Sequence, residues 1–86
     1  MGKMAKINRK LVSVFEELAI LEELEGVEWK PRAYRNAANG LREIDKSVKK
    51  IYQEEGEKGL KKIEGIGDSI ASHIVEYIKK GKIKKY

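Results

Sequence analysis

The chain has 86 residues, of which 41% are hydrophobic and 38% are charged, and it contains no cysteine. That length allows one domain with one modest core. Without cysteine, neither a disulfide framework nor a zinc-thiolate site can hold it together, so helix packing must do so. No apolar run approaches bilayer length, and no signal-peptide apolar segment follows the lysine-containing N-terminus, so we expect an intracellular protein with no membrane partner.

The net charge of +5 is unevenly distributed along the chain. Residues 1–28 carry four basic and six acidic side chains, a net −2, whereas residues 29–86 carry fifteen basic and eight acidic ones, a net +7. A one-sided basic surface indicates a polyanionic partner such as nucleic acid. The alternative is a lysine-rich surface that serves only solubility.

The first predicted helix begins near residue 7. Its apolar residues have the spacing that places side chains on one helix face. Asn8 is a candidate N-cap, and Gly26 is expected to end the helix. The apolar stripe consists of Ile7, Leu11, Val14, Leu18, Leu21 and Leu24.

A second helix is predicted to open near Pro31, because proline suits the first helical turn. Gly40 weakens this helix by about 1 kcal/mol relative to alanine, which indicates a close contact at that point. Asp45 is a candidate N-cap for a third helix. The inward-facing residues are Tyr34, Ala37, Ala38 and Leu41 in the second helix, and Val48, Ile51 and Tyr52 in the third.

Glycines punctuate the rest of the chain. Gly56 and Gly59 bracket a break, and a short helix is expected over residues 59–62. The segment Ile63–Gly67 is too short and glycine-rich for anything but a tight turn. Asp68 is a candidate N-cap for the last helix, which Gly81 ends. The apolar stripe of that helix is Ile70, Ala71, Ile74, Tyr77 and Ile78, and Ile83 is expected to begin a further element of a longer protein.

No alternating apolar pattern predicts a strand. The expected fold is therefore all-α, a compact four- to five-helix bundle that forms a single domain over residues 1–86. We expect one core containing Leu18, Leu41, Leu60 and Ile74.

Residues 60–71, with the sequence LKKIEGIGDSIA, carry the functional argument. Gly65 and Gly67 permit a sharp bend and leave no Cβ to keep a phosphate away. The following helix points unpaired N–H groups and its positive dipole end at the same place, and Lys61 and Lys62 add charge. This pattern resembles the helix-hairpin-helix motif, which implies DNA binding that is sequence-independent and salt-sensitive.

Three segments together resemble the N-terminal, lyase-type domain of family X DNA polymerases: residues 29–38 (WKPRAYRNAA), residues 60–71, and residues 74–83 (IVEYIKKGKI). The resemblance implies a monomeric module of DNA repair that binds gapped, nicked or 5′-phosphorylated DNA. It also implies that polymerase domains follow in a longer chain.

The same resemblance implies roles for individual residues. Lys30 and Tyr34 match a phosphate pocket, Ser69 stands where the family has a further lysine, and Arg32 and Arg35 are expected to compensate. Trp29 stands where the family places a side chain against a template base, although packing between the first two helices is an equal alternative. The backbone carbonyls of Lys61, Ile63 and Ile66 match a site for Na⁺ or K⁺, and no other cofactor is expected.

The largest departure from the family is His73, which stands at the position of the lysine that forms a Schiff base. An imidazole cannot form the imine that β-elimination requires. Lys80 lies almost two turns away, about 10 Å along the helix axis. Three functions remain open: a DNA-binding polymerase module without catalysis of its own, an active 5′-deoxyribose-phosphate lyase using a displaced lysine, and a free-standing DNA-binding or protein-interaction domain. For His73, contact with DNA or solvent is the simpler interpretation.

Overall fold

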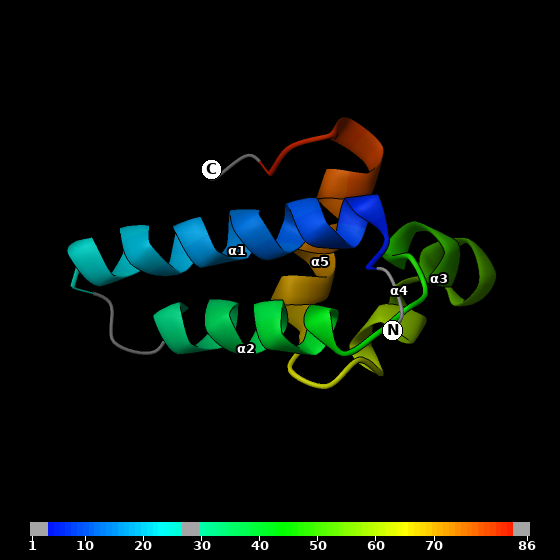
Figure 1. The fold of residues 1–86 in the computed structure, drawn as a ribbon, viewed down its shortest axis with the longest axis horizontal. Helices are drawn as coiled ribbons and strands as arrows, with labels where there is room; N and C mark the ends of the chain where they lie inside the picture. Colours follow the sequence, from blue (N-terminus) through cyan, green and yellow to red (C-terminus); the bar gives the residue numbers. More distant parts are fainter. Residues whose placement is uncertain (1–3, 27–29, 84–86) are drawn as a thin grey trace.

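The structure is a computed structural model that describes residues 4–26 and 30–83. Across these residues the fold is all-α, without a strand, as the sequence predicts (Figure 1). The helices are α1 (Lys6–Leu24), α2 (Lys30–Arg42), α3 (Val48–Glu55), α4 (Glu57–Lys61) and α5 (Asp68–Lys80).

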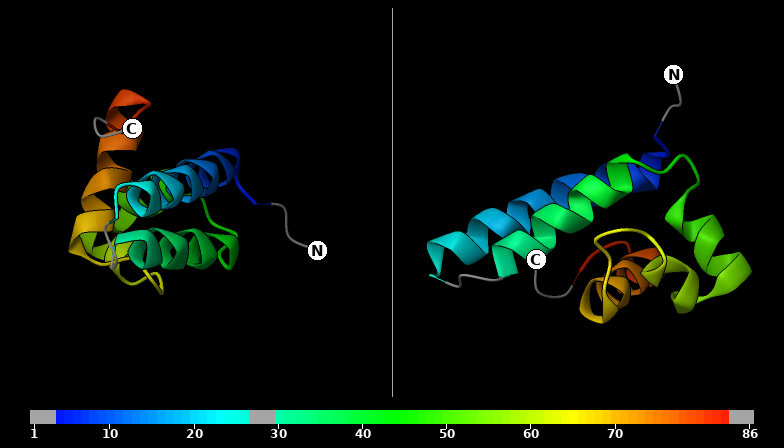
Figure 2. Two further views of the ribbon diagram at one scale, coloured as in Figure 1. Left: turned by 90° about the vertical axis from the view of Figure 1, so that its left-hand side faces the viewer. Right: turned by 90° about the horizontal axis from the view of Figure 1, so that it is seen from below.

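The first two helices lie side by side and run in opposite directions, and α5 crosses both of them steeply (Figures 1 and 2). The short helices α3 and α4 lie at the end of this pair where α1 begins and α2 ends (Figure 1). This arrangement places the connection between α4 and α5 beside α2, at the edge of the molecule.

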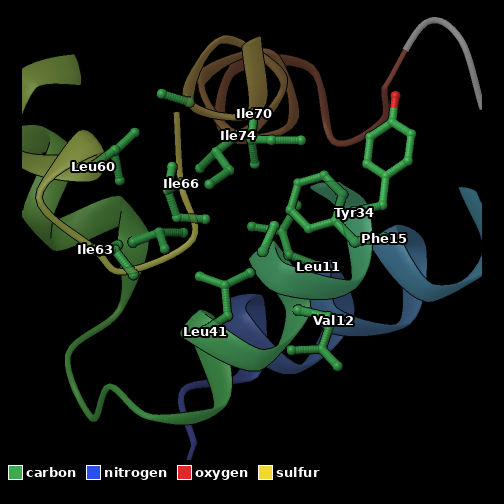
Figure 3. Close-up of a cluster of buried hydrophobic side chains, with 14 of the residues drawn as sticks. Leu11, Val12, Phe15, Tyr34, Leu41, Leu60, Ile63, Ile66, Ile70 and Ile74 are labelled. Atoms are coloured by element: carbon green, nitrogen blue, oxygen red, sulfur yellow. The ribbon is translucent and has the colours of Figure 1, made fainter. Parts of the chain in front are cut away.

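The four residues expected to share a core, Leu18, Leu41, Leu60 and Ile74, are each at most 1% exposed and belong to one cluster. Figure 3 shows how side chains from α1, α2, α5 and the α4–α5 connection converge on it. Ile83 is 2% exposed and joins the same cluster. Ile83 therefore contributes to this core, which its position after the last helix did not predict.

The apolar stripe predicted for α1 is correct only over its first part. Leu21 is 44% exposed and Leu24 is 80% exposed, whereas Glu22 is buried. Toward its end the buried face of α1 runs through Leu18, Ala19 and Glu22, so it lies beside the predicted stripe and leaves Leu21 and Leu24 at the surface.

Asn8 is buried within α1 and is not its N-cap, which is Ala5 without a side-chain hydrogen bond. The Asn8 amide Nδ2 donates to the carbonyl oxygen of Lys46 at 2.9 Å, and its Oδ1 accepts from the N–H of Val48 at 2.9 Å. Asn8 therefore satisfies two peptide groups of the segment that leads into α3. The periodicity of α1 does not reveal that tertiary role.

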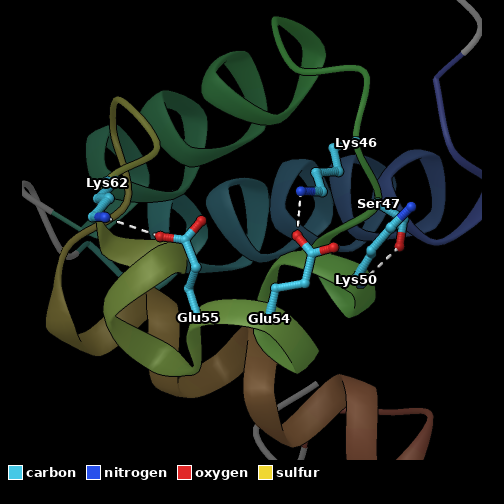
Figure 4. Close-up of polar contacts among 6 residues, drawn as sticks. All are labelled: Lys46, Ser47, Lys50, Glu54, Glu55 and Lys62. Atoms are coloured by element: carbon cyan, nitrogen blue, oxygen red, sulfur yellow. Dashed lines mark hydrogen bonds and ion pairs between the residues drawn. The ribbon is translucent and has the colours of Figure 1, made fainter.

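Two other predicted caps are also wrong. Ser47, not Asp45, caps α3, because its Oγ accepts from the N–H of Lys50 at 3.1 Å (Figure 4). The N-cap of α5 is Gly67, which has no side chain to offer, and Asp68 is the first residue of that helix.

The break between α3 and α4 consists of Gly56 alone, and α4 begins at Glu57, two residues earlier than expected. Gly59 lies inside α4, where a Cβ would come within 2.6 Å of the Cβ of Glu55. Gly59 therefore allows α3 and α4 to pack closely. At the other end of the domain Gly81 ends α5 as predicted, with its N–H donating to the carbonyl of Tyr77 at 2.8 Å.

Candidate nucleic-acid interface

A tight hairpin joins α4 to α5, as the sequence predicts. The N–H of Ile63 donates to the carbonyl of Leu60 at 3.1 Å, and the N–H of Ile66 donates to the carbonyl of Ile63 at 3.0 Å. The side chains of Ile63 and Ile66 point into the core (Figure 3), and Glu64, between them, is exposed. The two isoleucines thus anchor the turn from within and leave its backbone at the surface.

The two hairpin glycines have different surroundings. Gly65 has φ +87°, and a Cβ on it would lie 2.5 Å from the carbonyl oxygen of Asn36 in α2. A Cβ on Gly40 of α2 would lie 1.9 Å from the carbonyl oxygen of Glu64. Gly40 and Gly65 therefore let the hairpin backbone lie directly against α2. By contrast, a Cβ on Gly67 would meet nothing within 4 Å.

The start of α5 is open to solvent. Gly67 provides no side-chain cap, and Asp68 and Ser69 in the first turn are exposed. A helix of this length presents unpaired N–H groups and the positive end of its dipole at such a start. At Gly67, where even a Cβ would meet nothing within 4 Å, the backbone is open to an anion of the size of a phosphate.

Three of the cations expected near DNA, Arg35, Lys61 and Lys62, are ion-paired in this structure. The Nζ of Lys61 lies 3.0 Å from Oδ1 of Asp68, and the hydrogen bond that Lys61 donates to this carboxylate raises the pKa of Lys61 above its ordinary value. Arg35 pairs with a glutamate of α1, Glu23. Lys62 donates to Glu55 of α3 at 2.9 Å (Figure 4). The sequence did not indicate these partners, because each pair joins different helices.

The residues of the predicted phosphate pocket come from two helices, α2 and α5. Tyr34 stacks on Phe15 with ring centroids 5.9 Å apart, and its ring centroid lies 6.2 Å from that of His73. Tyr34 is 4% exposed, so its ring packs in the core as expected. Lys30 lies one turn before Tyr34 on α2, and Ser69 lies one turn before His73 on α5. Of these four candidates, the structure brings Tyr34 and His73 into contact.

The remaining candidates lie on α2, on α5 and outside the described residues. Nδ1 of His73 is 4.0 Å from Oε1 of Glu76, and both side chains are about one quarter exposed (23% and 24%). Arg32 is exposed on α2, and Lys80 is exposed at the last residue of α5, away from the hairpin. Trp29 lies outside the described residues.

Among residues 4–26 and 30–83, no group of three or more histidine, cysteine, aspartate or glutamate residues is placed to hold a metal ion. Over the same residues, no helix combines the length and the apolarity needed to cross a membrane.

These features define an all-α domain in which a tight glycine-containing hairpin leads into a helix whose first turn is exposed. A family profile described as the helix-hairpin-helix domain matches residues 6–83. The chain therefore belongs to the helix-hairpin-helix domain family, and this membership indicates DNA binding. No curated protein matches the chain significantly.

Proposed function

We propose that this domain grips the sugar-phosphate backbone of DNA without reading the base sequence. The observation that carries the proposal is the exposed backbone of the hairpin, which leaves the start of α5 open beside Gly67. Backbone N–H groups and lysines contact phosphates alike in every sequence, so such contacts position a duplex but do not select bases. The affinity for DNA should therefore be high at low salt and fall as the salt concentration rises, because binding releases counterions from the DNA.

A finer part of the proposal concerns the DNA structure. We propose that the domain binds gaps, nicks or 5′-phosphate ends as the N-terminal domain of a family X repair polymerase. The contact between the Tyr34 ring on α2 and the His73 ring on α5 supports this, because it joins two of the residues that the resemblance assigns to the DNA-contacting surface. In this proposal Arg32 and Arg35 add charge around the 5′-phosphate, and Trp29 meets a template base.

A monovalent cation, Na⁺ or K⁺, is also part of the proposal. The carbonyl oxygens of Lys61, Ile63 and Ile66 are uncharged donors of the type that binds such ions. The Ile63 carbonyl already accepts the N–H of Ile66 and has a second lone pair for an ion. A bound cation at the hairpin would add positive charge where the phosphate is expected.

The test is fluorescence anisotropy with labelled DNA across a salt series. Three substrates of identical sequence are compared: an intact duplex, a gapped duplex with a 5′-phosphate, and the same gapped duplex with a 5′-hydroxyl. We expect all three to bind, and the 5′-phosphorylated gap to bind best. Equal affinity for the three would contradict the gap-specific part, and no binding to any would contradict the proposed function as a whole.

A further inference from the structure

The hairpin carries a negative charge at the place where phosphate is expected. Asp68 is the first residue of α5, its side chain is 88% exposed, and its Oδ1 lies 3.0 Å from Nζ of Lys61. Because Lys61 is the last residue of α4, this ion pair joins the two helices across the mouth of the hairpin. The Lys61 ammonium is thereby held at the start of α5.

We infer that Asp68 is an internal competitor of DNA, occupying the lysine and the helix start that a phosphate would otherwise contact. This inference rests on the proposed function. Binding then involves an exchange: the phosphate takes the Lys61 ammonium and the Asp68 carboxylate turns to solvent. The exchange is possible because the pair is exposed, and exposed ion pairs are weak.

The same carboxylate stabilises the free protein. An acidic residue in the first turn of a helix interacts favourably with the positive end of the helix dipole, and Asp68 also holds α4 to α5 through Lys61. A bound phosphate would use both of these interactions. Removing the charge of Asp68 should therefore lower stability and raise DNA affinity, two effects of opposite sign from one substitution.

Glu64 offers a matched control. It lies in the same hairpin, its side chain is exposed, and it makes no ion pair with another described residue. Asp68→Asn and Glu64→Gln change the net charge by the same amount and keep the side-chain shape. A difference in DNA affinity between the two variants therefore reports where the charge lies and its pairing with Lys61. A general gain in positive charge would raise the affinity of both variants equally.

The experiment measures the anisotropy of a labelled mixed-sequence duplex at several salt concentrations, with urea unfolding of each protein in parallel. We expect Asp68→Asn to bind at least about threefold more tightly than Glu64→Gln and to unfold at lower urea. In a Lys61→Gln background the gain from Asp68→Asn should shrink. Equal gains from the two single variants, or a gain unchanged without Lys61, would overturn this inference alone. Absence of binding by every protein would overturn the proposed function and this inference with it.

Discussion

Gly65 and Gly67 look equivalent in the sequence, but their structural roles differ. The positive φ of Gly65 and its approach to Asn36 mean that any side chain there would push the hairpin off α2. Gly67 has φ −96° and ψ −169°, which other residues adopt readily, and its surroundings are open. A substitution at Gly67 can therefore test phosphate approach without disturbing the fold.

We accordingly expect Gly67→Val to weaken DNA binding about tenfold or more while the helix content is retained, because a branched side chain would stand between the phosphate and the start of α5. Gly65→Val should lose both binding and stability, since strain at positive φ adds about 1–3 kcal/mol. Anisotropy and thermal unfolding by circular dichroism measure the two properties. A folded Gly67→Val protein with unchanged affinity would show that DNA does not approach here.

His73 decides the expected chemistry of the domain. Since the imidazole cannot form an imine, we expect little borohydride trapping on an incised abasic DNA. His73→Lys should increase trapping, because it restores a primary amine beside Tyr34 and Glu76, whose contacts with His73 place this position. Efficient trapping by the unaltered protein that disappears in Lys80→Ala would instead show that the nucleophile is Lys80.

Replacing the buried Asn8 should lower the stability of the domain although the change in side-chain volume is small. Asn8→Ala removes the side-chain donor that bonds the Lys46 carbonyl and the side-chain acceptor that bonds the Val48 N–H. Leaving buried peptide groups unsatisfied costs about 1–3 kcal/mol, so the free energy of unfolding in urea should fall by at least that amount. Ser13→Ala, on the exposed face of the same helix, is the control and should change little. Equal stability of the two variants would contradict the role assigned to Asn8.

At the scale of the helices, most of the fold could be predicted. The periodic apolar residues of α2 and α5 are local signals, and all the core residues expected in α2 are buried. The hairpin was recognised because glycines at fixed spacing leave few alternatives. Helix periodicity and the glycine turn are set by residues close together in the chain, so both can be recognised from the sequence alone.

The caps and the ion pairs could not be predicted, because they depend on how the helices meet. Asn8, Asp45 and Asp68 are all good capping types, yet the path of the chain gives the capping role to none of them. Similarly, Lys61 was recognised as a cation, but its pairing with Asp68 appears only once the hairpin closes. The position of the hairpin was thus predicted, whereas the ion pair that joins its two ends was not.

At the scale of the whole molecule, the charge difference between the two parts of the chain should govern the binding thermodynamics. We expect the logarithm of the association constant to fall linearly with the logarithm of the salt concentration, since each phosphate contact releases condensed counterions. Lys61→Gln should reduce that slope by about one. Competition with unlabelled duplexes of different base composition should show similar affinities, and a strong preference for one sequence would contradict backbone recognition.

The two hydrogen bonds of Asn8 also affect how the domain opens. They connect positions 38 and 40 residues apart in the chain, whereas α1 and α2 pack against each other across a short connection. The α1–α2 pair can therefore form from local contacts, while α3, α4 and α5 must close a long loop before they dock. Amide protons of α1 and α2 should consequently exchange with solvent more slowly than those of α3 and α4. The hairpin between α4 and α5 would then belong to the part of the molecule that opens first, and if it holds DNA as proposed, a bound duplex should protect this part most.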